Sequence, residues 1–423
     1  MKLPRSHVTA LVLLAGISGI PLQAQRGFGN ALFQRYPFDK WAGEAAKPQI
    51  RWNVRIEPAS LSPHQRLVAQ IHVAVEGAEL QKRDANGQMV VLARIEDSAG
   101  HRWQTGFQTT ITRLRQGLKF RQLDYSVSAF ILPGDYFVSL AVCDGRTLEH
   151  SYMRRPFHVA EINSDPLPNA WTGLPTVEFL STIGSPEAWY LPQLRARLSF
   201  PVEAQRPLRV ELLVNTTPSD LASTNMFRQN MEVIVPSLKV LSGIDPARGS
   251  VGLSIIDLNR RLISYEQPNL RSADWRSMRR AFTGFNAASV DVKTLEGQRK
   301  MLDYFAAEAQ RRLGDPANDG DLPHVLIVLS APVFFTHQEK PPLPELPPDP
   351  GRRVFYIRYA PQPVPAPLRP DFPGDVRPQP LLFPFSDDIE HLLKPMRPRV
   401  FRVTRPEEFR KALGAILTEI AKM

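Results

Sequence analysis

Few residues of this sequence have types and spacings that could support catalysis. Two pairs of adjacent carboxylates, Glu96-Asp97 and Asp387-Asp388, could exchange protons, but each pair lies at an expected turn or helix start. A carboxylate in that position accepts hydrogen bonds from free backbone amides and interacts favourably with the helix dipole. Capping therefore accounts for both pairs, and we expect no general acid-base pair in this chain.

The cysteine and the histidines also fit structural roles. Cys143 is the single cysteine and follows apolar Val142, a setting typical of a small core residue. It excludes an intramolecular disulfide, so the fold must depend on ordinary core burial. The nine histidines are scattered, and His72, His158 and His324 fall within expected strands.

No catalytic motif compensates for these absences. The sequence contains no Gly-x-Ser-x-Gly, no His-Glu-x-x-His and no glycine-rich phosphate-binding loop. We therefore predict a protein that is not an enzyme. An enzyme with an unrecognised site remains the third hypothesis, which a convergent cluster of histidines and carboxylates would favour.

The N-terminus has the order of a secretory signal. Met1–His7 form a short basic region, Val8–Ile20 form an apolar run, and Pro21-Leu22-Gln23-Ala24 indicates cleavage after Ala24. The run of about 13 residues is shorter than the roughly 20 that cross a bilayer, and no later segment is longer. The sequence predicts export to an extracytoplasmic location, periplasmic or released, with no integral membrane segment after cleavage.

The rest of the 423-residue chain is long enough for two domains. Its 40 prolines cluster locally and indicate stiff connections. We expect, in order, a signal peptide at 1–24, a linker at 25–48, a β-sandwich at 49–160, a Pro-rich connection at 161–205, and an α/β domain at 206–423 with a Pro-rich insertion around 338–386.

The first domain alternates apolar and polar residues with period two. Trp52–Ile56, Leu67–Val75 and Met89–Ile95 show this pattern, and Asn86-Gly87 is a hairpin turn signal. Short strands at this spacing predict an antiparallel β-sandwich. With its Pro-Gly-Asp-Tyr turn at 133–136, the stretch resembles the immunoglobulin-like modules of secreted bacterial proteins.

The second domain alternates strands with helices, which predicts a mostly parallel, doubly wound sheet covered on both faces. The expected strands are Leu208–Val214, Ser250–Ile256, Leu262–Tyr265, His324–Leu329, Arg353–Ile357 and Arg399–Val403. The expected helices are Thr224–Leu241, Trp275–Phe285, Leu295–Leu313, Ile389–Leu393 and Pro406–Met423. Ser250–Ile256 and Leu262–Tyr265 are close enough in sequence to pair as a hairpin.

This element order resembles the von Willebrand factor type A (VWA) domain, and more closely the bacterial VWFA-related proteins. The most specific pieces are Leu212–Ser219, Val328–Ala331 and Phe401–Phe409. The resemblance covers about half of the chain and implies a Rossmann-type fold. It also implies a divalent metal site at the ends of the parallel strands, the ligand crevice of such sheets.

The family's metal motif, Asp-x-Ser-x-Ser, maps onto Asn215, Thr217 and Ser219, and its later Asp maps onto Ala331. Thr294 or Thr283 corresponds to the family's loop threonine. Mg²⁺ and Ca²⁺ gain much of their affinity from carboxylate charge, so the resemblance implies a degenerate site without a bound metal. Asn215 and Thr217 then serve as a cap and turn.

Three hypotheses for function follow, and the first leads. It is an exported, non-enzymatic scaffold that binds a protein partner and needs no cofactor. The second is metal-dependent adhesion at a rebuilt site in which Asp220 supplies a carboxylate for weak Mg²⁺ or Ca²⁺ binding. The formal net charge of +10 is scattered among acids and forms no basic stripe, so we expect no nucleic-acid partner.

Overall fold

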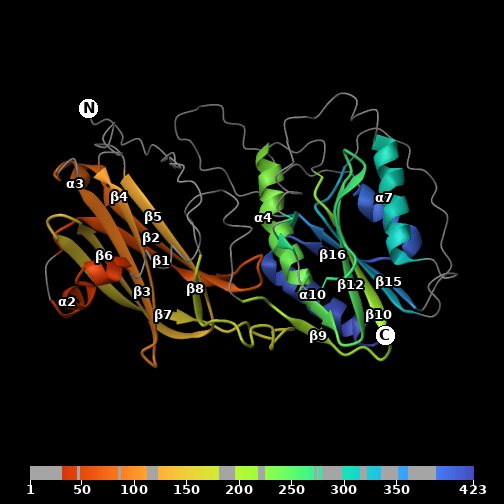
Figure 1. Cartoon of the computed structure of the whole chain (residues 1–423), viewed down its shortest axis with the longest axis horizontal. Helices are drawn as coiled ribbons and strands as arrows, with labels where there is room; N and C mark the ends of the chain where they lie inside the picture. The colour runs from red at the N-terminus through yellow and green to blue at the C-terminus, as the bar shows by residue number, and fades with distance from the viewer. Residues whose placement is uncertain are drawn as a thin grey trace, which may run out of the picture. The chain divides into compact units, whose positions relative to one another are not determined.

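The computed structural model describes residues 31–44, 48–83, 87–111, 122–180, 196–217, 224–270, 274–275, 277–278, 298–314, 322–334, 351–360 and 387–423. These residues divide into two compact units, the first ending in the region of residue 196 and the second running to the C-terminus. The expected signal peptide, the helix expected over Trp275–Phe285 apart from its first residues, and most of the Pro-rich insertion lie outside the described residues. Figure 1 shows both units.

The first unit contains two four-stranded antiparallel sheets. One has the order β1-β2-β5-β8, and the other has the order β4-β3-β6-β7. The strands are β1 (Trp52–Leu61), β2 (Leu67–Glu76), β3 (Gln88–Asp97), β4 (Arg102–Thr110), β5 (Gln122–Ile131), β6 (Gly134–Asp144), β7 (His150–Val159) and β8 (Val177–Phe179). Every neighbouring pair is antiparallel, as the period-two pattern predicted.

Side-chain alternation decides which face of each strand is buried. In β2, Ile71, Val73 and Val75 enter the core shared by the two sheets, whereas His72 and Ala74 between them point outward. The short helix α3 (Gly77–Gln81) follows β2 directly. The inward faces of the two sheets therefore form one shared core.

The segment expected as a linker, residues 25–48, contains packed structure. Helix α2 (Phe38–Gly43) buries Phe38 and Trp41 against outward residues of β3 and β6. The helix packs there because that part of the sheet is apolar on both faces. Cys143 belongs to this cluster, and burial raises the pKa of its thiol to about 12, as expected for a core residue.

The expected connection at 161–205 also contributes to both units. Its short strand β8 pairs with β5 in the first unit, and residues 165–170 belong to the second. Arg410 donates from Nε to Asp165 Oδ1 at 2.6 Å and from Nη2 to Asp165 Oδ2 at 2.7 Å. This bidentate pair explains why the second unit begins before residue 206.

The second unit is built on a six-stranded sheet with the order β13-β12-β10-β14-β15-β16. Its strands are β10 (Leu208–Asn215), β12 (Gly249–Asp257), β13 (Leu262–Gln267), β14 (His324–Ser330), β15 (Arg352–Tyr359) and β16 (Arg399–Val403). All neighbours are parallel except β12 and β13, which form the expected antiparallel hairpin. A separate parallel pair joins β9 (Phe200–Val202) to β11 (Ile244–Pro246).

Helices cover both faces of this sheet (Figure 1). They are α4 (Thr224–Leu241), α7 (Gln298–Leu313), α9 (Asp388–Leu393) and α10 (Pro406–Ile420), with a 3-10 turn η4 (Lys394–Met396) after α9. Helices α7 and α9 share a core cluster with Leu213, Val328 and Tyr356 of the sheet. Burial on both faces agrees with the continuous apolar runs of β10 and β14.

No helix among the described residues is long and apolar enough to cross a membrane.

Candidate functional site

The candidate site lies where the parallel strands β10 and β14 end. The chain passes from β10 to β12 on one side and later returns to β14 on the other, so the strand order changes direction at β10. Ligand crevices of open parallel sheets form outside the strand ends at such a switch point. Asn215 ends β10, and its register partner Ser330 ends β14.

The Asn215 side chain is almost fully buried and makes two hydrogen bonds. Its Nδ2 donates to Ser330 Oγ at 3.0 Å, which ties β10 to β14. Its Oδ1 accepts from the backbone N–H of Thr217 at 3.0 Å, which forms an Asx turn. Both ends of the amide are therefore engaged within the protein, and the predicted turn role of Asn215 is the one that its geometry supports.

The next residues extend the same network to β12. Thr217 Oγ1 accepts from the backbone N–H of Leu258 at 2.7 Å, and the backbone N–H of Thr216 donates to Ile256 O at 3.3 Å. Ser330 Oγ donates to Ala331 O at 2.5 Å. Three strand ends are thus joined by hydrogen bonds among their own residues.

Two described positions of the family's metal motif, Asn215 and Ala331, offer no carboxylate to a divalent metal. The amide oxygen of Asn215 already accepts a backbone hydrogen bond, and the methyl group of Ala331 cannot ligate. Among the described residues, no group of three or more His, Cys, Asp or Glu side chains could hold a metal ion. Ser219, Asp220, Thr283 and Thr294 lie outside the described residues.

A buried carboxylate ends β12, and the sequence did not single it out. Asp257 is almost fully buried, and its Oδ1 accepts from the backbone N–H of Arg260 at 3.1 Å. Burial raises the pKa of Asp257, against the opposing hydrogen bond and charge of Arg260. Asp257 therefore stabilises the β12–β13 turn and contributes a proton-binding group at the same edge of the sheet.

A second buried carboxylate, Asp387, joins three elements beside the crevice. Its Oδ1 accepts from the backbone N–H groups of Val333, after β14, and Ile389, in α9, both at 3.2 Å. Its Oδ2 accepts from the hydroxyl of Tyr356 in β15 at 2.5 Å and lies 3.5 Å from Nε of Arg358. The contact with Ile389 confirms the predicted capping role, whereas nothing in the sequence indicated the contacts with Tyr356 and Arg358.

Burial has the largest effect on the pKa of Asp387. It raises the pKa of the carboxyl to about 6, although the hydrogen bonds from Tyr356, Val333 and Ile389 and the charge of Arg358 lower it. Burial and the neighbouring Asp387 also raise the pKa of Tyr356. The Asp387 carboxyl therefore takes up a proton at a higher pH than an exposed aspartate does.

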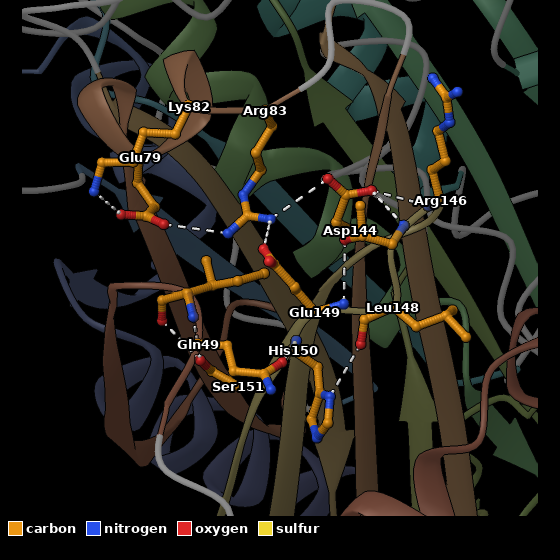
Figure 2. A network of polar contacts seen from close by, with 12 residues as sticks. Gln49, Glu79, Lys82, Arg83, Asp144, Arg146, Leu148, Glu149, His150 and Ser151 are labelled. Atoms are coloured by element: carbon orange, nitrogen blue, oxygen red, sulfur yellow. Dashed lines mark hydrogen bonds and ion pairs between the residues drawn. The ribbon is translucent and has the colours of Figure 1, made fainter.

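A network of polar contacts in the first unit surrounds Arg83 (Figure 2). Its Nη1 donates to Glu149 Oε2 at 2.7 Å and to Asp144 Oδ2 at 3.4 Å, and its Nη2 donates to Glu79 Oε1 at 3.2 Å. Burial would raise the pKa of Glu79, but hydrogen bonds from Lys82 and Arg83 outweigh it and lower that pKa. The guanidinium thus neutralises carboxylates at the end of α3 and around the β6–β7 turn, a structural task.

The comparisons with known proteins assign no family. No family model matches the sequence, and no curated protein matches it. One solved structure that is similar over part of the chain is the X-ray structure of Northeast Structural Genomics Consortium target SoR45, at 14% identity. The match covers 28% of this chain and 92% of that one with a TM-score of 0.18, which is too low to support an inference about fold or function.

We predict that Asp387 makes stability depend on pH. Because burial raises its pKa in the folded state, the folded protein binds more protons than the unfolded chain between about pH 4 and pH 6, and the free energy of unfolding falls as pH rises through this window. Asp387→Asn should remove about 2 to 3 kcal/mol of this pH-dependent change. Urea unfolding at several pH values, followed by circular dichroism, measures it.

Tyr356→Phe provides the matched comparison for Asp387. It removes one hydrogen bond that favours the ionised carboxylate, so the pH midpoint of the effect should move upward. Equal pH profiles for the native chain and the Asp387→Asn variant would contradict the assignment.

We also predict that Arg83→Met destabilises the first unit by roughly 3 to 5 kcal/mol, because it removes the cation beside buried Asp144 and leaves buried Glu79 with Lys82 alone. The control is Arg102→Met, since Arg102 is half exposed and its pair with Glu96 contributes only about 0 to 1 kcal/mol. Chemical denaturation of both variants measures the difference. Similar losses in the two variants would show that the Arg83 cluster is not the buried neutralising network described here.

Proposed function

We propose that this protein is an exported, non-enzymatic scaffold whose second unit is a VWA-like domain that binds a protein partner without a metal ion. The sheet order, with β10 at the switch point and one antiparallel strand at the edge, supports the VWA-like assignment. The Asn215–Ser330 hydrogen bond is the observation that carries the metal-independent part of the proposal. Export rests on the basic and apolar order of residues 1–24.

The hydrogen bonds at the ends of β10 and β14 support binding of a protein partner more than they support catalysis. Asn215, Thr217 and Ser330 satisfy one another or the backbone, so no activated nucleophile or free base faces the strand ends among the described residues. A rigid edge of this kind offers shape and backbone groups to a partner. Fold similarity alone does not establish binding, because function resides in sites.

The first test concerns metal. We expect the melting temperature of the full chain, with the leader removed, to be unchanged by millimolar Mg²⁺, Mn²⁺ or Ca²⁺. A ligand at 100 times its Kd would stabilise the native state by about 2.7 kcal/mol, which a melt detects readily. The chain must retain Asp165, because a fragment starting at residue 206 would leave Arg410 without its buried partner.

A double variant supplies the positive control for the metal test. Asn215→Asp with Ala331→Asp introduces the two carboxylates that the resemblance implies, and we expect it to gain a metal-dependent rise in melting temperature. A rise in the native chain that Asp220→Ala abolishes would reverse the proposal and favour metal-dependent adhesion.

The second test concerns the partner. We expect a photo-crosslinking residue at Arg260, an exposed position just beyond the end of β12, to capture a protein from extracytoplasmic extracts. The same residue at Arg206, which is exposed just before β10 begins, is the matched control at the opposite end of the sheet. Mass spectrometry identifies the adduct, and the purified partner must then bind the chain directly. Equal capture at both positions, or none, would contradict binding at the crevice.

A further inference from the structure

The outer face of the β1-β2-β5 sheet carries a depression of about 450 Å³. Ala74 in β2 forms its floor, and the strand register places Asn53 of β1 and Asp124 of β5 on either side of Ala74. Arg55 and His72 belong to the next row of outward residues. The depression exists because a methyl side chain stands where the neighbouring outward positions carry long polar ones.

The walls of the depression are held in place by hydrogen bonds. His72 Nδ1 lies 2.9 Å from Ser126 Oγ across β2 and β5, and His72 Nε2 lies 3.4 Å from Glu57 Oε1. Asp124 Oδ1 accepts from Gln122 Nε2 at 2.8 Å. His72 and Asp124 are therefore oriented before any ligand arrives, which lowers the entropic cost of binding.

Opposite charges stand at two ends of the depression. Among the described lining residues, Arg55 is the one arginine or lysine and Asp124 is the one carboxylate. Arg55 pairs with Glu57 at 2.9 Å, but its side chain is 70% exposed, so that pair is weak and a ligand carboxylate competes for it at small cost. The charges therefore suit a ligand with both an anionic and a cationic group.

The spacing of these charges sets the size of the ligand. Two strand spacings of about 4.8 Å and one two-residue step of about 7 Å separate the backbones of Arg55 and Asp124. The two backbones are therefore roughly 12 Å apart. The Arg55 and Asp124 side chains can extend toward each other across this distance and contact the two termini of an extended dipeptide, which spans about 7 Å. One face of the Tyr125 ring stacks on Phe107 with the ring centroids 4.8 Å apart, so that face is not available to a ligand.

We propose that this depression binds a small zwitterionic ligand of dipeptide size, with the ligand carboxylate at Arg55 and its ammonium group at Asp124. The site belongs to the first unit and is independent of the function proposed for the second. Its recognition is electrostatic and hydrogen-bonded, so binding weakens as ionic strength rises.

Isothermal titration of the full chain with glycylglycine at low salt tests the proposal. N-acetylglycylglycine and glycylglycine amide each lack one charge and should bind at least about tenfold more weakly. This comparison uses the native chain and requires no variant. Absence of glycylglycine binding up to tens of millimolar, or equal binding of the three ligands, would overturn the proposal.

Variants then locate the site. Arg55→Gln and Asp124→Asn should each weaken binding about tenfold, and Ala74→Leu should abolish it by filling the floor. Gln70→Leu is the matched control, since it adds the same side chain to the same face of β2 outside the depression. Circular dichroism melts verify that the variants fold. Glycylglycine binding that survives Ala74→Leu at full strength would place the ligand elsewhere and contradict the assignment.

Discussion

The two hydrogen bonds of the Asn215 amide hold together the edge of the parallel sheet at which β10 and β14 end. One bond joins the ends of β10 and β14, and the other turns the chain at Thr217. An ionised carboxylate has no proton to donate, so an ionised aspartate at this position could not make the bond that Asn215 Nδ2 donates to Ser330 Oγ. The neutral amide of Asn215 instead forms hydrogen bonds with Ser330 and Thr217 at the strand ends. The difference between this edge and the metal motif that the resemblance implies therefore lies in two side chains, the amide of Asn215 and the methyl group of Ala331.

Carboxylates are still present around this edge, but each is assigned to the fold. Asp257 accepts from the turn after β12, and Asp387 connects the segment after β14 with β15 and α9. Because burial disfavours the charged form of both side chains, they bind protons more readily than an exposed aspartate. The charged side chains Asp257 and Asp387 thus bind loop backbone at this end of the sheet. The network at the switch point consists of the neutral side chains of Asn215, Thr217 and Ser330.

The sequence predicted the elements better than it predicted the contacts. The predicted limits of α4 and β16 agree with the structure, although Pro236 lies inside α4. The packing of α2 was missed because it depends on outward residues of distant strands, although the unbroken apolar run Met89–Ala93 was an available signal of burial on both faces. The Tyr356–Asp387 bond joins residues 31 positions apart, and no spacing rule reports such a pair.

The two candidate binding regions differ in how their polar groups are satisfied. At the crevice, the hydrogen-bonding groups are buried and engage one another, so a ligand would have to break existing bonds to make new ones. On the outer face of β1-β2-β5, Arg55 is exposed and weakly paired beside a floor formed by Ala74. Replacing Glu57 by a ligand carboxylate as the ion-pair partner of Arg55 costs little free energy. A small polar ligand therefore displaces fewer existing bonds at the sheet face than at the ends of β10 and β14.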